Sequence, residues 1–203
     1  MDTVPMAARA AAYLQRHGRS LWDAALPRSA RQRRRERALC ALGDVTFTSV
    51  TFVCQGNINR SAVAEQRWRM IVSVASLPVR SAGLHRKGGR LSPKVSVAAA
   101  ARLGVDLRSH RSTVASHLAP ADILLVGFEP HHLRVWHRAP ERERGAVLLG
   151  VFDEDDGAPL HIPDPYNRDV EYVQAVFGRV IRCVDQLAAR LEPLDATRWR
   201  LRA

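Results

Sequence analysis

The chain of 203 residues contains little cysteine, little lysine and no long apolar run. Its three cysteines, Cys40, Cys54 and Cys183, are odd in number and far apart, which argues against a disulfide framework and favours a reducing compartment. No segment approaches the ~18 apolar residues that cross a bilayer, and the N-terminal stretch lacks the apolar core of a secretory signal. These absences predict a cytoplasmic protein with no membrane span.

The positive charge of the chain is almost entirely arginine. All but two of its 31 basic residues are arginines, and the formal net charge is +11. Such a bias, beside long alanine tracts, is more typical of a GC-rich coding sequence than of a surface selected to bind phosphates. Nine of the arginines lie in residues 1–44. We interpret this segment as a solvated basic extension with short helices at 6–14, 21–26 and 31–42. An acidic partner, nucleic acid or an anionic membrane surface is the alternative for it.

After residue 45 the pattern changes to apolar strands that alternate with amphipathic helices. The periodicity predicts strands at 47–53, 78–81, 123–126 and 146–149, and helices at 61–75, 93–103, 129–137 and 170–191. Strands that alternate with helices form right-handed crossovers, and hence a parallel sheet covered by helices on both faces. We therefore predict three parts: a basic, Arg-rich helical extension at 1–45, an α/β domain at 46–192 and a C-terminal tail at 193–203.

The segment that carries the clearest chemistry is the loop at 54–61, Cys-Gln-Gly-Asn-Ile-Asn-Arg-Ser, between the first strand and the first helix of the domain. A strand–loop–helix turn directs several backbone N–H groups and the positive end of a helix dipole at one point, which creates an anion site. Gly56 and Asn57 are residue types that tolerate a positive φ, as an inward-curling loop requires.

Two side chains make this loop more than an anion site. The amides and the helix terminus would stabilise a thiolate at Cys54 and lower its pKa. Arg60 follows six residues later, and its planar guanidinium can bind two phosphoryl oxygens at once. Ser61 is positioned to donate a hydrogen bond to the thiolate. These features predict nucleophilic attack on a phosphoryl group.

The loop closely resembles the phosphate-binding loop of the low-molecular-weight protein tyrosine phosphatases. The resemblance extends over residues 46–192, through Ser81-Ala82-Gly83, Gly104-Val105-Asp106, His110-Arg111-Ser112 and Asp164-Pro165-Tyr166, which occur in the family's order and spacing. It implies an α/β three-layer sandwich with a four-stranded parallel sheet between helices, and the N-terminal helical extension stays unmatched.

The resemblance also implies a role for each matching residue. Cys54 would attack phosphorus to form a cysteinyl-phosphate, Arg60 would hold the phosphoryl oxygens, and Asp164 would act as general acid and then as general base. The substrate and phosphate would contact a further set of residues: Gln55, Gly56, Asn57, Ile58, Asn59, Ser61 and Tyr166. Ser81 and His110 would support the loop. No cofactor and no metal are implied, and the expected partner is a phosphotyrosine protein such as a bacterial tyrosine kinase.

The sequence departs from the family at several positions. Asn59 stands where the family usually has a second loop cysteine, so oxidised Cys54 would lack a resolving thiol in the loop. Gly127-Phe128 replaces the usual Met-Asp after the third strand, and we expect a local effect only. Ile58 is aliphatic as in tyrosine-directed members, whereas the arginine-phosphatase branch tends to have threonine there.

Two other functions are compatible with the sequence. One is a thiol-dependent arsenate reductase of the same fold, which would need further cysteines to relay a disulfide. The other is a catalytically inert relative that binds phosphate or nucleic acid through the basic extension, although nucleic acid is the disfavoured partner. Cys40 and Cys183 lie in helical apolar stripes and are predicted to be packing residues. His131, His132 and His137 could suggest a metal, but no cysteine or carboxylate stands at ligand spacing from them, so no metal site is predicted.

Overall fold

The computed structural model describes residues 25–73, 75–117, 123–133 and 145–202. The strands are β1 (Thr46–Phe47), β2 (Ser49–Cys54), β3 (Val79–Gly83), β4 (Ile123–Gly127), β5 (Ala146–Leu148), β6 (Leu191–Pro193) and β7 (Trp199–Leu201). The α-helices are α2 (Arg28–Leu42), α3 (Arg60–Ile71), α4 (Lys94–Ala101), α5 (Pro130–Leu133) and α6 (Val170–Ala189), with 3-10 turns η1 (Ala115–His117) and η4 (Leu149–Phe152).

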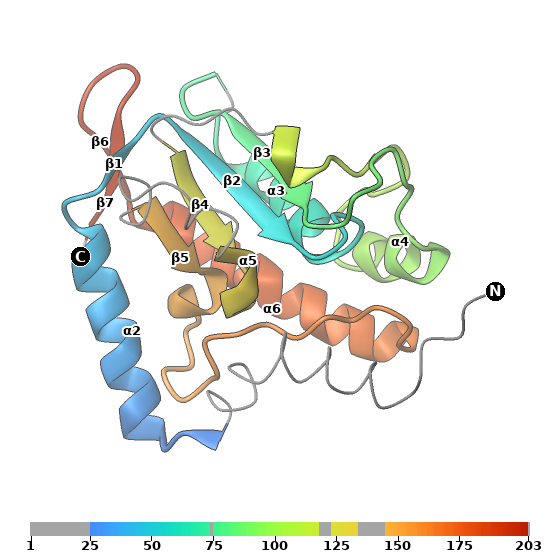
Figure 1. Cartoon of the computed structure of the whole chain (residues 1–203), viewed down its shortest axis with the longest axis horizontal. Helices are drawn as coiled ribbons and strands as arrows, with labels where there is room; N and C mark the ends of the chain where they lie inside the picture. Colours follow the sequence, from blue (N-terminus) through green and yellow to red (C-terminus); the bar gives the residue numbers. More distant parts are fainter. Residues whose placement is uncertain (1–24, 74, 118–122, 134–144, 203) are drawn as a thin grey trace.

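A four-stranded parallel sheet forms the centre of the fold and confirms the predicted architecture. Its order is β3-β2-β4-β5, and Figure 1 shows these arrows side by side and pointing in one direction. β2 lies between β3 and β4, and Cys54 at its end is opposite Gly83. The carboxyl ends of the central strands therefore meet at one edge of the sheet, where α/β proteins bind their ligands.

The two faces of the sheet bury side chains of alternate residues. Val50, Phe52 and Cys54 of β2 belong to the main core, which α3 and α6 cover. Val53 points to the opposite face, where it packs with Leu125 and with Leu133 of α5. This alternation follows the two-residue period of a strand. It fixes the direction in which Cys54 leaves the sheet.

A second, smaller sheet joins the start of the α/β domain to the C-terminal segment. β1, β7 and β6 form an antiparallel sheet in which Thr46 pairs with Arg200 and Phe47 pairs with Trp199. The strand predicted at 47–53 is therefore two strands, because residues 46–47 pair with β7 and only residues 49–54 join the parallel sheet. The predicted tail at 193–203 forms most of the β6–β7 hairpin, and Leu201 at its end is buried. The sequence pattern did not indicate this sheet.

The other predicted elements occur with shifted ends. The helix expected at 61–75 ends at Ile71, that at 93–103 is α4, and that at 170–191 ends at Ala189. Gly104 takes a positive φ of 75°, as expected of a helix C-terminal glycine. The helix predicted at 129–137 is described only as α5, since residues 134–137 lie outside the described ranges. The predicted helix at 6–14 and nearly all of that at 21–26 also lie outside them.

The last helix of the basic extension packs against the domain. α2 begins earlier than predicted, at Arg28, and ends at Leu42 as expected, with Gly43 as its cap residue. The Arg35 side chain is buried and donates to the carbonyl oxygens of Val151 (3.0 Å) and Gly150 (3.2 Å) in η4. Burial, partly offset by nearby carboxylates, lowers the pKa of Arg35. Leu42 lies in the main core, whereas Cys40 is exposed. The prediction that Cys40 packs in an apolar stripe is therefore wrong, because α2 buries a different face.

Within the described ranges, no helix combines the length and the apolar character that crossing a bilayer requires.

Replacing Arg35 by alanine should lower the free energy of unfolding by about 1–3 kcal/mol, because the carbonyl group of Val151 loses its donor and that of Gly150 keeps only the N–H of Asp153. Arg33→Ala, which removes an exposed arginine from the same helix, should change it by no more than about 0.5 kcal/mol. Urea unfolding measures both. Equal values for the two variants would show that the hydrogen bonds of Arg35 to η4 do not stabilise the domain.

Candidate active site

The loop at 54–61, called the phosphate loop below, curls between the end of β2 and the start of α3. The Asn59 cap residue makes no side-chain cap hydrogen bond to the helix. Its side chain is turned away, since Oδ1 accepts a hydrogen bond from Ser96 Oγ at 2.7 Å. The helix terminus therefore keeps first-turn amides available for an anion in the loop.

Asn57 holds the loop in shape. Its φ is 52°, a left-handed conformation that asparagine adopts more readily than most residues. Its Nδ2 donates to Ser61 Oγ (2.9 Å) and Ser81 Oγ (2.7 Å), and its Oδ1 accepts from the backbone N–H of Thr113 (2.7 Å). Its backbone carbonyl accepts from His110 Nε2 at 2.8 Å. One residue thus connects the loop to α3, β3 and the segment that carries His110.

Gly56 differs from the expectation, because its φ is not positive. A side chain there is instead restricted by space, since an added Cβ would lie 3.2 Å from Ile58 and 3.4 Å from Arg90. Gly83 is the glycine that the loop strictly requires. A Cβ on Gly83 would come within 2.8 Å of the backbone of Asn57 and Gly56.

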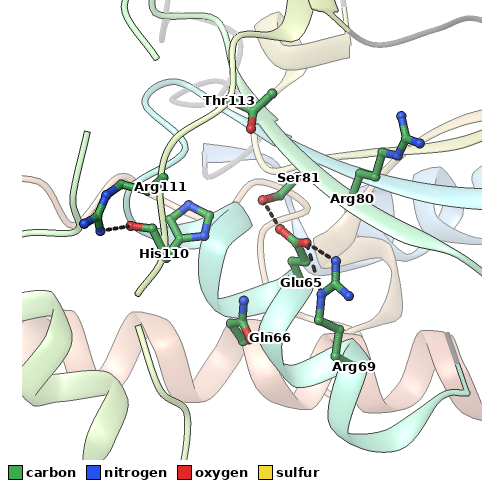
Figure 2. Close-up of a pocket in the computed structure, with 8 residues that line it drawn as sticks. All are labelled: Glu65, Gln66, Arg69, Arg80, Ser81, His110, Arg111 and Thr113. Carbon is green, nitrogen blue, oxygen red and sulfur yellow. Dashed lines mark hydrogen bonds and ion pairs between the residues drawn. The ribbon is translucent and has the colours of Figure 1, made fainter. Parts of the chain in front are cut away.

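The support extends behind the loop into a hollow of about 300 Å³, drawn in Figure 2. Ser81 donates to Glu65, and Arg69 donates to the same carboxylate at 2.7 and 3.1 Å. Figure 2 shows this chain of contacts between β3 and α3, with His110 across the hollow. Glu65 was missed by sequence reasoning, although its place one helical turn after Ser61 puts both residues on one face of α3.

Cys54 is buried at the base of the loop, with 2% of its surface exposed. Its Sγ accepts a hydrogen bond from the N–H of Asn57 at 3.2 Å and lies 3.0 Å from Ser61 Oγ. Ser61 Oγ accepts from Asn57, and its own hydrogen can be donated either to this sulfur or to the carbonyl oxygen of Ala82, which lies 3.5 Å away. The sulfur is the nearer of the two acceptors.

Arg60 is buried on the other side of the site. Its Nη1 donates to Glu129 Oε1 and to the carbonyl oxygen of Ile162, both at 2.7 Å. Its Nε and Nη2 are buried and form no hydrogen bond within the described structure. Nη2 does lie 3.1 Å from Asp164 Oδ2. The Nε and Nη2 edge of the guanidinium is therefore left to bind two oxygens of an anion.

Glu129 is a functional residue that the sequence analysis missed. It follows β4 by two residues, is 1% exposed, and holds Arg60 in place through Nη1. The Phe128 ring lies 5.7 Å from the guanidinium carbon of Arg60. The sequence did contain a signal for it, because Glu129 comes just after the carboxyl end of a strand. Ligand sites of α/β proteins form at that edge of the sheet.

The charges of this site act mainly on Arg60. Burial, the largest single influence, would lower the pKa of Arg60, but Asp164, Glu129 and Cys54 together outweigh it and raise that pKa. The guanidinium therefore stays charged. Asp164 is half-buried, and its Oδ1 accepts from the N–H of Tyr166 at 3.2 Å. Tyr166 itself is 55% exposed.

A cluster beside Arg60 could hold a metal ion by geometry. Ligand atoms of Glu129, His131 and His132 lie within 4.8 Å of one another, so the expectation that no carboxylate accompanies these histidines is wrong. His137 lies outside the described residues. His132 Nδ1 accepts from the N–H groups of Phe128 and Glu129, and Glu129 is already paired with a guanidinium. These contacts already use the lone pair of His132 Nδ1 and the charge of Glu129, which disfavours a bound cation. We interpret the cluster as the group that holds Arg60 in position.

The predicted site residues thus fall into three groups. Cys54, Arg60 and Asp164 converge, since Arg60 interacts with both of the others. Asn57, Ser61, Ser81 and His110 form the network inside the loop. Gln55 and Gly56 are partly exposed on the loop, Ile58 is nearly buried, and the Asn59 side chain faces Ser96.

Comparisons with known proteins agree with this geometry. The family model described as low molecular weight phosphotyrosine protein phosphatase matches residues 49–196. The chain is 30% identical over 152 residues to the low molecular weight protein-tyrosine-phosphatase Etp of Escherichia coli K12, covering 74% of this chain and 99% of Etp. It is 31% identical over 150 residues to Wzb of the same organism, covering 71% of this chain and 96% of Wzb.

Among solved structures, the tyrosine phosphatase Wzb of Escherichia coli K30, crystallised with sulphate, has a TM-score of 0.61 at 28% identity. The match covers 70% of this chain and 97% of that one.

Replacing Asn57 by alanine should weaken binding of inorganic phosphate at least tenfold and lower the free energy of unfolding by about 3 kcal/mol or more, because the loop loses its network and keeps a strained φ. Asn167→Ala is the matched control, since Asn167 also has a positive φ, of 58°, but is exposed. It should cost about 1–2 kcal/mol and leave phosphate binding intact. Similar phosphate affinities for both variants would contradict the role of Asn57.

Proposed function

Because the chain belongs to the low molecular weight protein-tyrosine-phosphatase family, we propose that it hydrolyses phosphotyrosine through a cysteinyl-phosphate intermediate at Cys54. The observation that carries this proposal is the buried Nε and Nη2 edge of Arg60, whose one partner is the Asp164 carboxylate 3.1 Å from Nη2, together with a buried sulfur that accepts a hydrogen bond from the loop. Together they provide a nucleophile and a receptor for phosphoryl oxygens.

In the first step, the thiolate of Cys54 attacks phosphorus and forms the S–P bond while the bond from phosphorus to the phenolic oxygen breaks. Arg60 and the loop amides bind the equatorial oxygens, where charge accumulates in the transition state. The hydrogen bond from Ser61 stabilises the sulfur as an anion, so it also helps sulfur to leave in the second step.

Asp164 is the proposed proton donor to the departing phenolate. A bound phosphoryl dianion competes with Asp164 for Nη2 of Arg60, 3.1 Å away. The displaced carboxyl group lies beside the bound anion, and in this proposal it carries the proton that the leaving group receives. After the phenol departs, the carboxylate accepts a proton from the water that hydrolyses the cysteinyl-phosphate.

The proposed substrate is a protein phosphotyrosine. Tyr166 is exposed beside Asp164 and offers an aromatic wall to a phenyl ring, and aliphatic Ile58 fits tyrosine-directed members of the family. A bacterial tyrosine kinase is the partner that we expect.

An arsenate reductase would need a second thiol to relay a disulfide. Cys183 is buried in α6, and burial raises the pKa of its thiol to about 12. Cys40 is on α2, which contacts η4 rather than the phosphate loop. These placements favour the phosphatase over the reductase.

Replacing Cys54 by serine should abolish hydrolysis of para-nitrophenyl phosphate and retain affinity for inorganic phosphate, because the amides and Arg60 remain. Cys40→Ser, at an exposed thiol, should keep full activity. Steady-state rates and phosphate titrations measure both. More than a few per cent of wild-type turnover in the Cys54 variant would rule out this residue as the nucleophile.

Replacing Asp164 by alanine should slow hydrolysis of phenyl phosphate by about 10²-fold or more, because phenolate is a poor leaving group that needs a proton. Aryl phosphates with acidic leaving groups should lose far less. The slope of log kcat/KM against leaving-group pKa is the measurement. An equal loss for every leaving group would count against a general acid at this position.

A further inference from the structure

One segment lies along the phosphate loop and bonds to three of its carbonyl groups in succession. Residues 84–91, called the rim loop here, follow β3 and lead toward α4 (Figure 1). The N–H of Leu84 donates to Cys54 O at 3.1 Å and that of His85 to Gln55 O at 2.9 Å. Arg90 Nη2 donates to Gly56 O at 2.6 Å. The rim loop is therefore a wall of the site.

The rim loop is also fixed from its other side and within itself. Ser112 accepts from the N–H of Arg90 through its Oγ (3.0 Å), and the two residues bond again through Ser112 N–H and Arg90 O (2.9 Å). Gly89, with a φ of 74°, donates to Ser112 O at 2.7 Å. His85 Nδ1 accepts from the N–H of Lys87, and Arg90 Nε donates to Lys87 O. The backbone that carries Arg86 and Lys87 is thus held in place before any substrate arrives.

The charge of this wall is positive and uncompensated. The rim loop contains Arg86, Lys87 and Arg90, and residues 84–105 include no aspartate or glutamate. Elsewhere in the chain many arginines are paired, as in Arg67–Asp185 and Arg179–Asp153. In the described structure, none of the three rim cations takes part in an ion pair, and Arg86 and Lys87 are exposed.

We propose that Arg86 and Lys87 bind acidic side chains that flank the phosphotyrosine, so that the enzyme selects acidic phosphopeptides over neutral and basic ones. The proposal rests on the proposed function. An extended peptide advances about 3.3–3.6 Å per residue, so carboxylates within a few positions of the phosphotyrosine reach a wall that bonds directly to the phosphate loop. Opposite charges there favour productive binding, and basic flanks are repelled.

The test compares three phosphotyrosine peptides of equal length whose flanking residues are acidic, neutral amide or basic. The wild-type protein should show the highest kcat/KM for the acidic peptide. In Arg86→Gln/Lys87→Gln the ratio of acidic to neutral peptide should fall about three- to tenfold, as expected for two exposed charge contacts. Hydrolysis of para-nitrophenyl phosphate, which has no flanks, should be unchanged. Added salt should reduce the wild-type preference, because it shortens the screening length.

The matched control is Arg33→Gln/Arg37→Gln, which removes the same charge from exposed positions of α2, at the opposite edge of the molecule from α4 (Figure 1). It should keep the full preference. An equal loss in this control would assign the preference to net charge and overturn the proposal. The proposal would also be overturned by a wild-type protein that does not discriminate, or by a rim variant whose ratio of acidic to neutral peptide equals that of the wild-type protein.

The same peptides should also be titrated into the Cys54→Ser protein, where equal affinities would overturn the rim proposal without reference to turnover. Absence of para-nitrophenyl phosphate hydrolysis by the wild-type protein would instead contradict the proposed function.

Discussion

The left-handed conformation of Asn57 is the constraint on which the site depends. A positive φ in a non-glycine residue costs free energy, which surrounding contacts must offset. Here Ser61, Ser81 and Thr113 bond to the Asn57 side chain. His110 bonds to its backbone carbonyl. Because these partners lie on α3, β3 and the 110–113 segment, the loop reaches its shape only when the sheet and its helices are assembled. Anion binding and the stability of the fold are therefore coupled.

The second requirement is a guanidinium that is held in position and still has N–H groups to donate to a ligand. Glu129 and the Ile162 carbonyl hold Nη1 of Arg60, and Phe128 packs beside it, while Nε and Nη2 stay available. A buried arginine without such an anchor would lose its hydration with no compensating contact, and its side chain could turn away from the ligand. Glu129 and the Ile162 carbonyl both bond to Nη1, so they fix the guanidinium without using its other two nitrogens.

Helix α2 and the small antiparallel sheet stabilise the domain rather than form the site. α2 buries Arg35 against η4 and Leu42 in the core, and the β1–β7–β6 sheet joins the start of the domain to the end of the chain. These contacts place the last helix of the basic extension against the domain. The rim loop is different, since it bonds directly to the phosphate loop and carries cations into its surroundings.

The sequence predicted structure and chemistry best where a local pattern of residue types has one physical explanation. The alternation of apolar strands and helices predicted the parallel sheet, and the loop from Cys54 to Ser61 indicated the nucleophile and the phosphate receptor. The same signals misplaced Cys40, because the direction that α2 faces depends on what it packs against. They also predicted a positive φ for Gly56, whereas Asn57 is the residue of the phosphate loop that adopts it.

Residue order by itself determined the sheet, the chemistry of the loop and the identity of Cys54 and Arg60 as candidates, since these follow from periodicity and from residue types close together in the chain. Asp164 became a candidate through the resemblance of Asp164-Pro165-Tyr166 to the family's motif. Only the tertiary structure decided that Glu129 anchors Arg60, that Glu65 braces Ser81, that residues 46–47 leave the main sheet and that the rim loop lines the site. Each of these depends on contacts between segments far apart in the chain, and their energies arise only when the folded molecule brings them within hydrogen-bonding distance.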